Sequence, residues 1–93
     1  MMLYFEWHRE KEYLNIKKHN VSFKEAQTVF EDPLGIYKPD YVHSIGEERS
    51  YLIGNSNKNR LIVVSFTERA DKIRIISARL ATKNERKIYE KRG

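Results

Sequence analysis

Two arginines interrupt an otherwise apolar stretch near the end of the chain, KIRIISARL, from Lys72 to Leu80. Its β-branched residues and alternating side chains predict a strand, in which packing alone requires neither Arg74 nor Arg79. Alternation would place these two arginines on opposite faces of the strand. The preceding runs, 49–54 and 60–67, are also typical of strands and are separated by short polar turns. The sequence therefore predicts a meander of three antiparallel strands.

The N-terminal part alternates signals for strand and helix. Leu3, Phe5 and Trp7 have the period of a short strand. The following residues, 9–19, are strong helix formers, and Asn20 stands where a left-handed residue ends a helix. We expect this helix to bury a narrow stripe, formed by its few apolar residues, Tyr13, Leu14 and Ile16.

Two further helices begin with the pattern of a capping box, in which a hydroxyl residue is followed three positions later by glutamate. Ser22 and Glu25 open a helix that Pro33 ends, and Thr82 and Glu85 open a short basic helix. A short strand over 34–38 is expected between the second helix and the meander. The predicted fold class is α+β, an antiparallel sheet with the N-terminal helix pair packed on one face and a short C-terminal helix.

Length and charge limit the function classes. A chain of 93 residues predicts one domain, 1–93, and its longest uncharged run, Ser50–Asn57, is too short to span a membrane. With no cysteine and no paired histidines, neither a disulfide nor a metal centre is expected, and the cytoplasm is the expected location. The segment 58–93 holds eleven Lys or Arg against four Asp or Glu, within a net charge of +5. This basic half favours a polyanionic partner, although a solvated cationic surface would have the same composition.

Glu68 stands among arginines at the expected hairpin between the last two strands. A carboxylate beside guanidiniums stays ionised and can accept a proton, so Glu68 is a candidate base on a surface suited to phosphate. Arg79, with Arg69 and Arg74, is a candidate for phosphate binding because the guanidinium fork matches two phosphate oxygens. The alternative for all four residues is a set of structural ion pairs.

Two long blocks, FEWHREKEYLNIKKHNVSFKEAQTVFEDP and GNSNKNRLIVVSFTERADKIRIISARLATKNERKIYE, resemble the BrnT family of bacterial toxins. The resemblance rests on FEW, the KH pair before VSF, the TER triplet and RIISAR, in this order and spacing. It implies a single BrnT-like toxin domain with a RelE-like fold, and a ribonuclease that arrests translation without a cofactor. It also implies an antitoxin with a ribbon-helix-helix domain, through which alone the complex would bind DNA.

The resemblance adds four candidate residues. His19 lies in a family-like motif and is a candidate acid or base, although a histidine at a helix C-terminus also stabilises the helix dipole. Lys18 and Lys83 are candidates for RNA phosphate binding. Tyr89 is a candidate for base stacking, with an anchor against the sheet as the alternative.

This chain departs from the family pattern at three positions. His8 replaces the usual Asp after FEW, Asn20 replaces Gly, and Leu80 replaces an arginine often found after SAR; Lys83 is a possible substitute for that cation. Two other functions fit the same composition, a non-catalytic RNA- or DNA-binding module and a basic protein-interaction domain.

Overall fold

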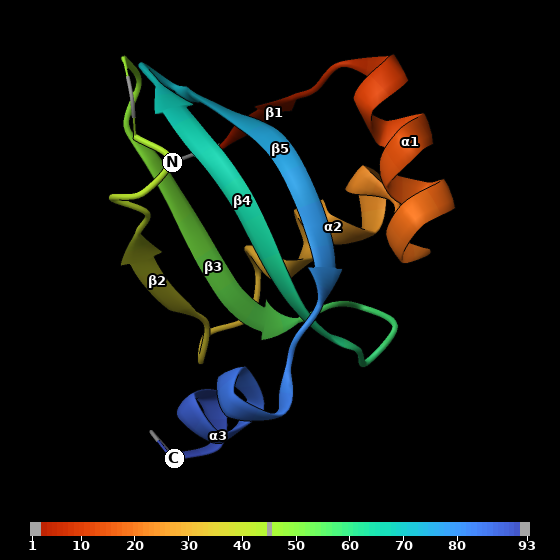
Figure 1. Ribbon diagram of the computed structural model, residues 1–93, viewed down its shortest axis with the longest axis vertical. Helices are drawn as coiled ribbons and strands as arrows, with labels where there is room; N and C mark the ends of the chain where they lie inside the picture. The colour runs from red at the N-terminus through yellow and green to blue at the C-terminus, as the bar shows by residue number, and fades with distance from the viewer. Residues whose placement is uncertain (1–2, 45, 92–93) are drawn as a thin grey trace.

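The computed structural model describes residues 3–44 and 46–91 and has the predicted order of elements (Figure 1). Within these residues the elements are β1 (Tyr4–Glu6), α1 (Arg9–His19), α2 (Phe23–Val29), β2 (Ile36–Pro39), β3 (Arg49–Asn55), β4 (Leu61–Arg69), β5 (Lys72–Leu80) and α3 (Lys83–Lys91). The strand predicted over 34–38 begins and ends slightly later. No helix in this part of the chain is long and apolar enough to cross a bilayer.

The described strands form one five-stranded sheet in the order β1-β5-β4-β3-β2. The pairs from β2 to β5 are antiparallel, which confirms the meander, and β1 adds to β5 in parallel. The turn before β4 places Asn59 at φ 59° and the turn before β5 places Ala70 at φ 53°. Asparagine tolerates this left-handed conformation better than alanine does, so the second turn is the more strained of the two.

The main core lies between the sheet and α2, which covers one face (Figure 1). We call this the helix face; its fully buried strand residues include Leu52, Ile62, Val64, Phe66 and Ile75. The apolar residues predicted for the second helix, Phe23, Ala26 and Val29, are all buried against it. The apolar residues at helical spacing in α2 and the alternating apolar residues of the strands therefore pack into one core, as the sequence predicts.

The buried stripe predicted for α1 is wrong. Tyr13, Leu14 and Ile16 are 58%, 60% and 41% exposed, whereas Asn15 is buried. Its amide nitrogen donates to the carbonyls of Val21 and Ala78, both at 2.8 Å, and its oxygen accepts from the Ala78 N–H at 3.1 Å. Because β1 pairs only with the first part of β5, the outer edge of β5 at Ala78 needs another partner, and Asn15 supplies it.

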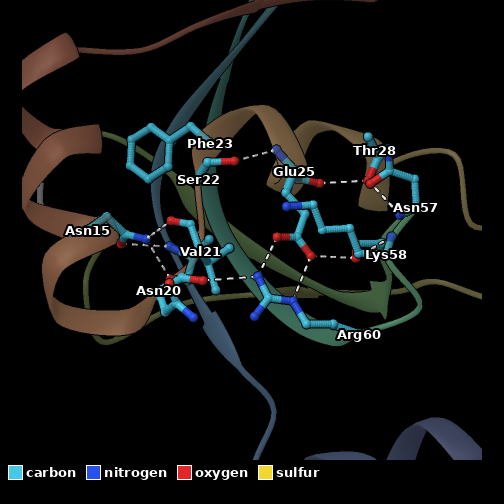
Figure 2. Close-up of polar contacts among 12 residues, drawn as sticks. Asn15, Asn20, Val21, Ser22, Phe23, Glu25, Thr28, Asn57, Lys58 and Arg60 are labelled. Atoms are coloured by element: carbon cyan, nitrogen blue, oxygen red, sulfur yellow. Dashed lines mark hydrogen bonds and ion pairs between the residues drawn. The ribbon is translucent and has the colours of Figure 1, made fainter.

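The helix ends follow the predicted patterns with two exceptions, both in α2. This helix ends at Val29, four residues before the predicted end at Pro33. Asn20 ends α1 in the left-handed conformation, at φ 57°, and the Thr82 and Glu85 box is reciprocal. The Ser22 hydroxyl caps α2 by accepting from the Glu25 N–H, but the Glu25 carboxylate does not return to Ser22 (Figure 2). Glu25 is buried and instead accepts from Ser56 at 2.6 Å and from Arg60 Nε at 2.9 Å.

On the opposite face of the sheet, α3 covers one end. Tyr89 packs there with Ile53, Leu61 and Val63. Its hydroxyl donates to the Asp32 carboxylate at 2.6 Å and accepts from Asn55 at 3.3 Å. Tyr89 therefore attaches α3 to the sheet, which matches the alternative of an anchor rather than a stacking surface.

Candidate functional site: a cationic groove on the open face of the sheet

A β-bulge brings Arg74 and Arg79 to the same face. Ser65 pairs with Ser77, but Phe66 pairs with Ile75, so the ladder skips one residue of β5. The odd spacing between the arginines would place them on opposite faces of a regular strand. The skipped residue offsets this spacing, so both lie on the face opposite the one that α2 covers. The prediction that they occupy opposite faces is therefore wrong, because alternation holds only for a continuous ladder.

This open face carries a groove with a volume of about 440 Å³. We call it the groove; its lining residues are Asp40, Val42, His43, Arg49, Tyr51, Val63, Ser65, Ser77, Arg79 and Glu85. Hydroxyl groups from β3, β4 and β5 lie side by side in it, because Tyr51 pairs with Ser65 and Ser65 with Ser77. Arg79 stands at the end near α3, and Arg49 stands on β3 at the opposite side of Tyr51. The groove is thus polar along its middle and cationic at both ends.

The three arginines predicted for phosphate binding each have a carboxylate partner. Arg69 pairs with Glu47 at 2.7 Å, Arg74 with Glu6 at 3.2 Å, and Arg79 with Glu85 at 2.7 Å. All three arginines therefore form the structural ion pairs that were the alternative to phosphate binding. Because every partner comes from another element, these pairs also brace the loop, β1 and α3 against the sheet.

The Arg79 clamp is the most developed of these pairs. Both terminal nitrogens donate to Glu85, at 2.7 and 2.8 Å, and one also donates to the Leu80 carbonyl at 3.3 Å. The hydrogen bonds from Arg79 lower the pKa of Glu85 from 4.5 to about 2. The same bonds raise the pKa of Arg79, and its side chain stays 42% exposed. A guanidinium has five N–H donors, so Arg79 keeps donors for a further anion.

Arg49 was missed by the sequence reasoning, which placed it only at the start of a strand. It pairs across the sheet with Thr67, which pairs in turn with Arg74, so two guanidinium side chains flank Thr67. Within 3–44 and 46–91, the Arg49 guanidinium has no hydrogen bond or ion pair, and the buried Thr67 hydroxyl has no partner. Arg49 is therefore a cation of this face to which no carboxylate in the described residues is hydrogen-bonded.

The structure does not bring Glu68 together with the arginines. Glu68 alternates with Thr67 and Arg69, so it lies on the helix face, in a shallow depression with Tyr37 and Phe66. Burial and the nearby Glu68 charge raise the pKa of Tyr37, which agrees with this position. The expectation of one pocket holding Glu68 and Arg79 is therefore wrong, because the sheet separates them; the catalytic role of Glu68 stays a prediction.

The other predicted cations lie outside the groove. Lys18 and His19 are in the last turn of α1, which packs against β5 and contributes nothing to the lining. Lys83 is exposed at the start of α3 and is not a lining residue. The role of His19 as acid or base and the roles of Lys18 and Lys83 in phosphate binding remain predictions.

A histidine and an aspartate in the groove were also missed. His43 Nδ1 lies 3.0 Å from Asp40 Oδ2, and both residues come from the polar segment between β2 and β3. Nothing in the local sequence marks this pair, apart from a spacing of three residues in a loop. In the part of the chain that the structure describes, no group of three or more His, Cys, Asp or Glu could hold a metal ion.

Fold and groove together define a small α+β protein with arginines along one open face of its sheet. A family model described as "Ribonuclease toxin, BrnT, of type II toxin-antitoxin system" matches residues 7–85. The chain belongs to this BrnT family, and it is a ribonuclease toxin of a type II system, which implies a cognate antitoxin.

One solved structure supports the fold assignment. The chain is similar to the crystal structure of the Brucella abortus ribonuclease toxin, BrnT, with a TM-score of 0.69 and 22% sequence identity. The match covers 88% of this chain and 100% of that chain, so the two share their architecture over nearly their whole length. A comparison with functionally curated proteins finds no match.

Proposed function

We propose that the groove is where this toxin holds RNA, and that it cleaves RNA without a metal and thereby arrests translation. The single observation that carries this proposal is the set of cations on one open face, Arg49, Arg74 and Arg79, beside the hydroxyls of Ser65 and Ser77. Guanidiniums match phosphate oxygens in pairs, and hydroxyls donate to the oxygens that remain.

RNA phosphate would compete with the carboxylates for these arginines. No carboxylate in the described residues is hydrogen-bonded to Arg49, and Arg79 retains donors beside its bonds to Glu85. One RNA phosphate near Arg49 and another near Arg79 would position the RNA strand between them, over Ser65 and Ser77. This arrangement fits a single strand, which can lay its backbone along a basic groove.

The antitoxin is proposed to carry a ribbon-helix-helix domain and to cover the groove, so that RNA is excluded and the complex binds DNA through the antitoxin alone. An acidic segment would suit this face, because it would meet the same arginines as RNA does. An antitoxin whose footprint leaves Arg79 exposed to solvent would contradict this part of the proposal.

The decisive experiment compares Arg79→Ala and Arg49→Ala with Arg86→Ala, an arginine on the exposed surface of α3. We expect the two groove variants to weaken binding of a short RNA and to flatten its salt dependence, each by about one phosphate contact. Cleavage should fall with them, whereas Arg86→Ala should behave as the parent protein. Unchanged binding and cleavage in both groove variants would overturn the proposal.

Glu68→Gln tests the opposite face in the same assay. Since Glu68 lies beyond the sheet from Arg79, we expect its loss to leave RNA affinity and cleavage near the parent values. Loss of cleavage with retained binding would instead support the predicted role of Glu68 as base and would move the site to the helix face.

A further inference from the structure

The loop that carries His43 is closed by hydrogen bonds at its base. The Asp40 N–H donates to the Arg49 carbonyl at 2.8 Å, and the Arg49 N–H donates to the Ser44 hydroxyl at 3.0 Å. The Ser44 hydroxyl donates in turn to the Asp40 carbonyl at 2.5 Å. These bonds tie both ends of the loop to β3 and hold His43 over the groove.

Asp40 determines which ring nitrogen of His43 can act as an acceptor. An ionised carboxylate only accepts hydrogen bonds, so the contact of 3.0 Å requires His43 Nδ1 to donate. The neutral imidazole then carries its lone pair on Nε2, the nitrogen turned away from Asp40. The His43 side chain is 65% exposed, and Nε2 has no hydrogen-bond partner in the described residues.

The groups that face His43 across the groove favour a proton acceptor. Arg49 and Arg79 are cationic, Tyr51 and Glu85 are the other titratable groups of the lining, and Glu85 is bound to Arg79. The Asp40 charge would stabilise the imidazolium that forms when Nε2 takes a proton. The same arginines would hold the phosphate at which the transferred charge accumulates.

We propose that His43 is the general base of the reaction and that Asp40 is its positioning residue, an inference that rests on the proposed function of the groove. His43 Nε2 takes the proton of a ribose 2′-hydroxyl, and the 2′-oxygen forms a bond to the adjacent phosphorus. The bond from phosphorus to the 5′-oxygen breaks, and its electron pair stays on that oxygen, which takes a proton from water. The resulting hydroxide takes the proton from His43, so the products are a 2′,3′-cyclic phosphate and a 5′-hydroxyl.

The test compares His43→Gln with His8→Gln, at a histidine outside the groove lining. With a short RNA, we expect His43→Gln to lower the cleavage rate about 100-fold while leaving RNA affinity and thermal unfolding unchanged. The His8→Gln control should cleave as the parent does, and the parent's product should end in a cyclic phosphate.

Asp40→Asn separates positioning from a structural role. We expect a smaller loss in kcat than in His43→Gln, with KM for the short RNA unchanged, because an amide at position 40 no longer requires Nδ1 to donate and so no longer keeps Nε2 as the acceptor. A full cleavage rate in His43→Gln would overturn this inference and leave the groove intact as the RNA site, provided that Arg79→Ala still loses binding. Loss of RNA binding in His43→Gln would also overturn it, since a base is not needed for affinity.

Discussion

Two carboxylate–arginine clamps of the same chemistry lie on opposite faces of the sheet, and they have different environments. Glu25 and Arg60 join α2 to the turn between β3 and β4, with side chains 2% and 29% exposed (Figure 2). Glu85 and Arg79 join α3 to β5 beside the groove, with side chains 19% and 42% exposed. The first pair has nearly complete burial of its carboxylate, so it serves stability, whereas the second remains accessible to a competing anion.

The largest expected effect is on the buried clamp. Arg60→Met leaves the Glu25 carboxylate buried with only Ser56 as a side-chain donor, and we expect a loss of about 3 kcal/mol in the free energy of unfolding. Urea denaturation measures it, and Arg86→Met, at an exposed position, is the matched control. A loss below about 1 kcal/mol would mean that this clamp is no more important to stability than a surface pair.

A second effect on the helix side concerns Asn15. Asn15→Ala removes the hydrogen bonds to Val21 and to both backbone groups of Ala78, and we expect a loss of about 2 kcal/mol. Leu14→Ala, at its 60% exposed neighbour, should change the free energy of unfolding by less than about 0.5 kcal/mol. Equal losses in the two variants would show that Leu14 is buried in solution, contrary to the structure.

The groove clamp should respond mainly in RNA affinity. Glu85→Gln removes a charge that competes with phosphate for Arg79, so we expect tighter RNA binding and a smaller loss of stability than in Arg60→Met, because this pair is the more exposed of the two. Binding titrations at two salt concentrations measure the affinity, with Glu90→Gln on the exposed side of α3 as control. Weaker RNA binding in Glu85→Gln would mean that the clamp holds Arg79 in place for RNA.

The smallest effect is the acid dependence of the groove clamp. The pKa of Glu85 is lowered from 4.5 to about 2, so its ionised form stabilises the folded protein above about pH 4.5, and this contribution is lost as the pH falls towards 2. The pKa of Glu25 is lowered as well. The difference in unfolding free energy between the parent and Glu85→Gln should therefore shrink from pH 4.5 to pH 2. A difference that stays constant between pH 4.5 and pH 2 would contradict the lowered pKa of Glu85.

Local patterns of sequence predicted much of the fold. The order of elements, the left-handed Asn20 at the end of α1 and the Thr82–Glu85 cap follow from spacings of a few residues. The same local pattern was incomplete at Ser22, because Glu25 is paired with Arg60, which lies far along the chain. A contact with a distant residue overrides a local preference when burial makes that contact more favourable.

The candidate site was predicted less well than the fold. Arg74 and Arg79 were found because cations in an apolar strand are conspicuous, but their common face depends on one skipped residue opposite β4. Glu68 was assigned to the arginines by proximity in sequence, and alternation along β4 turns it to the helix face. His43 and Asp40 join the groove through a loop that only the fold brings over the sheet.

By itself the sequence determined which segments are helices and strands, where most of them end, and that the C-terminal half is basic, because these properties depend on neighbours within a turn or two. Tertiary structure alone decided which side of the sheet each charge occupies and which carboxylate each arginine meets. These choices depend on strand register and on contacts such as that of Asn15 with Ala78, between residues 63 positions apart. Register is a property of paired strands, so no single strand's sequence contains it.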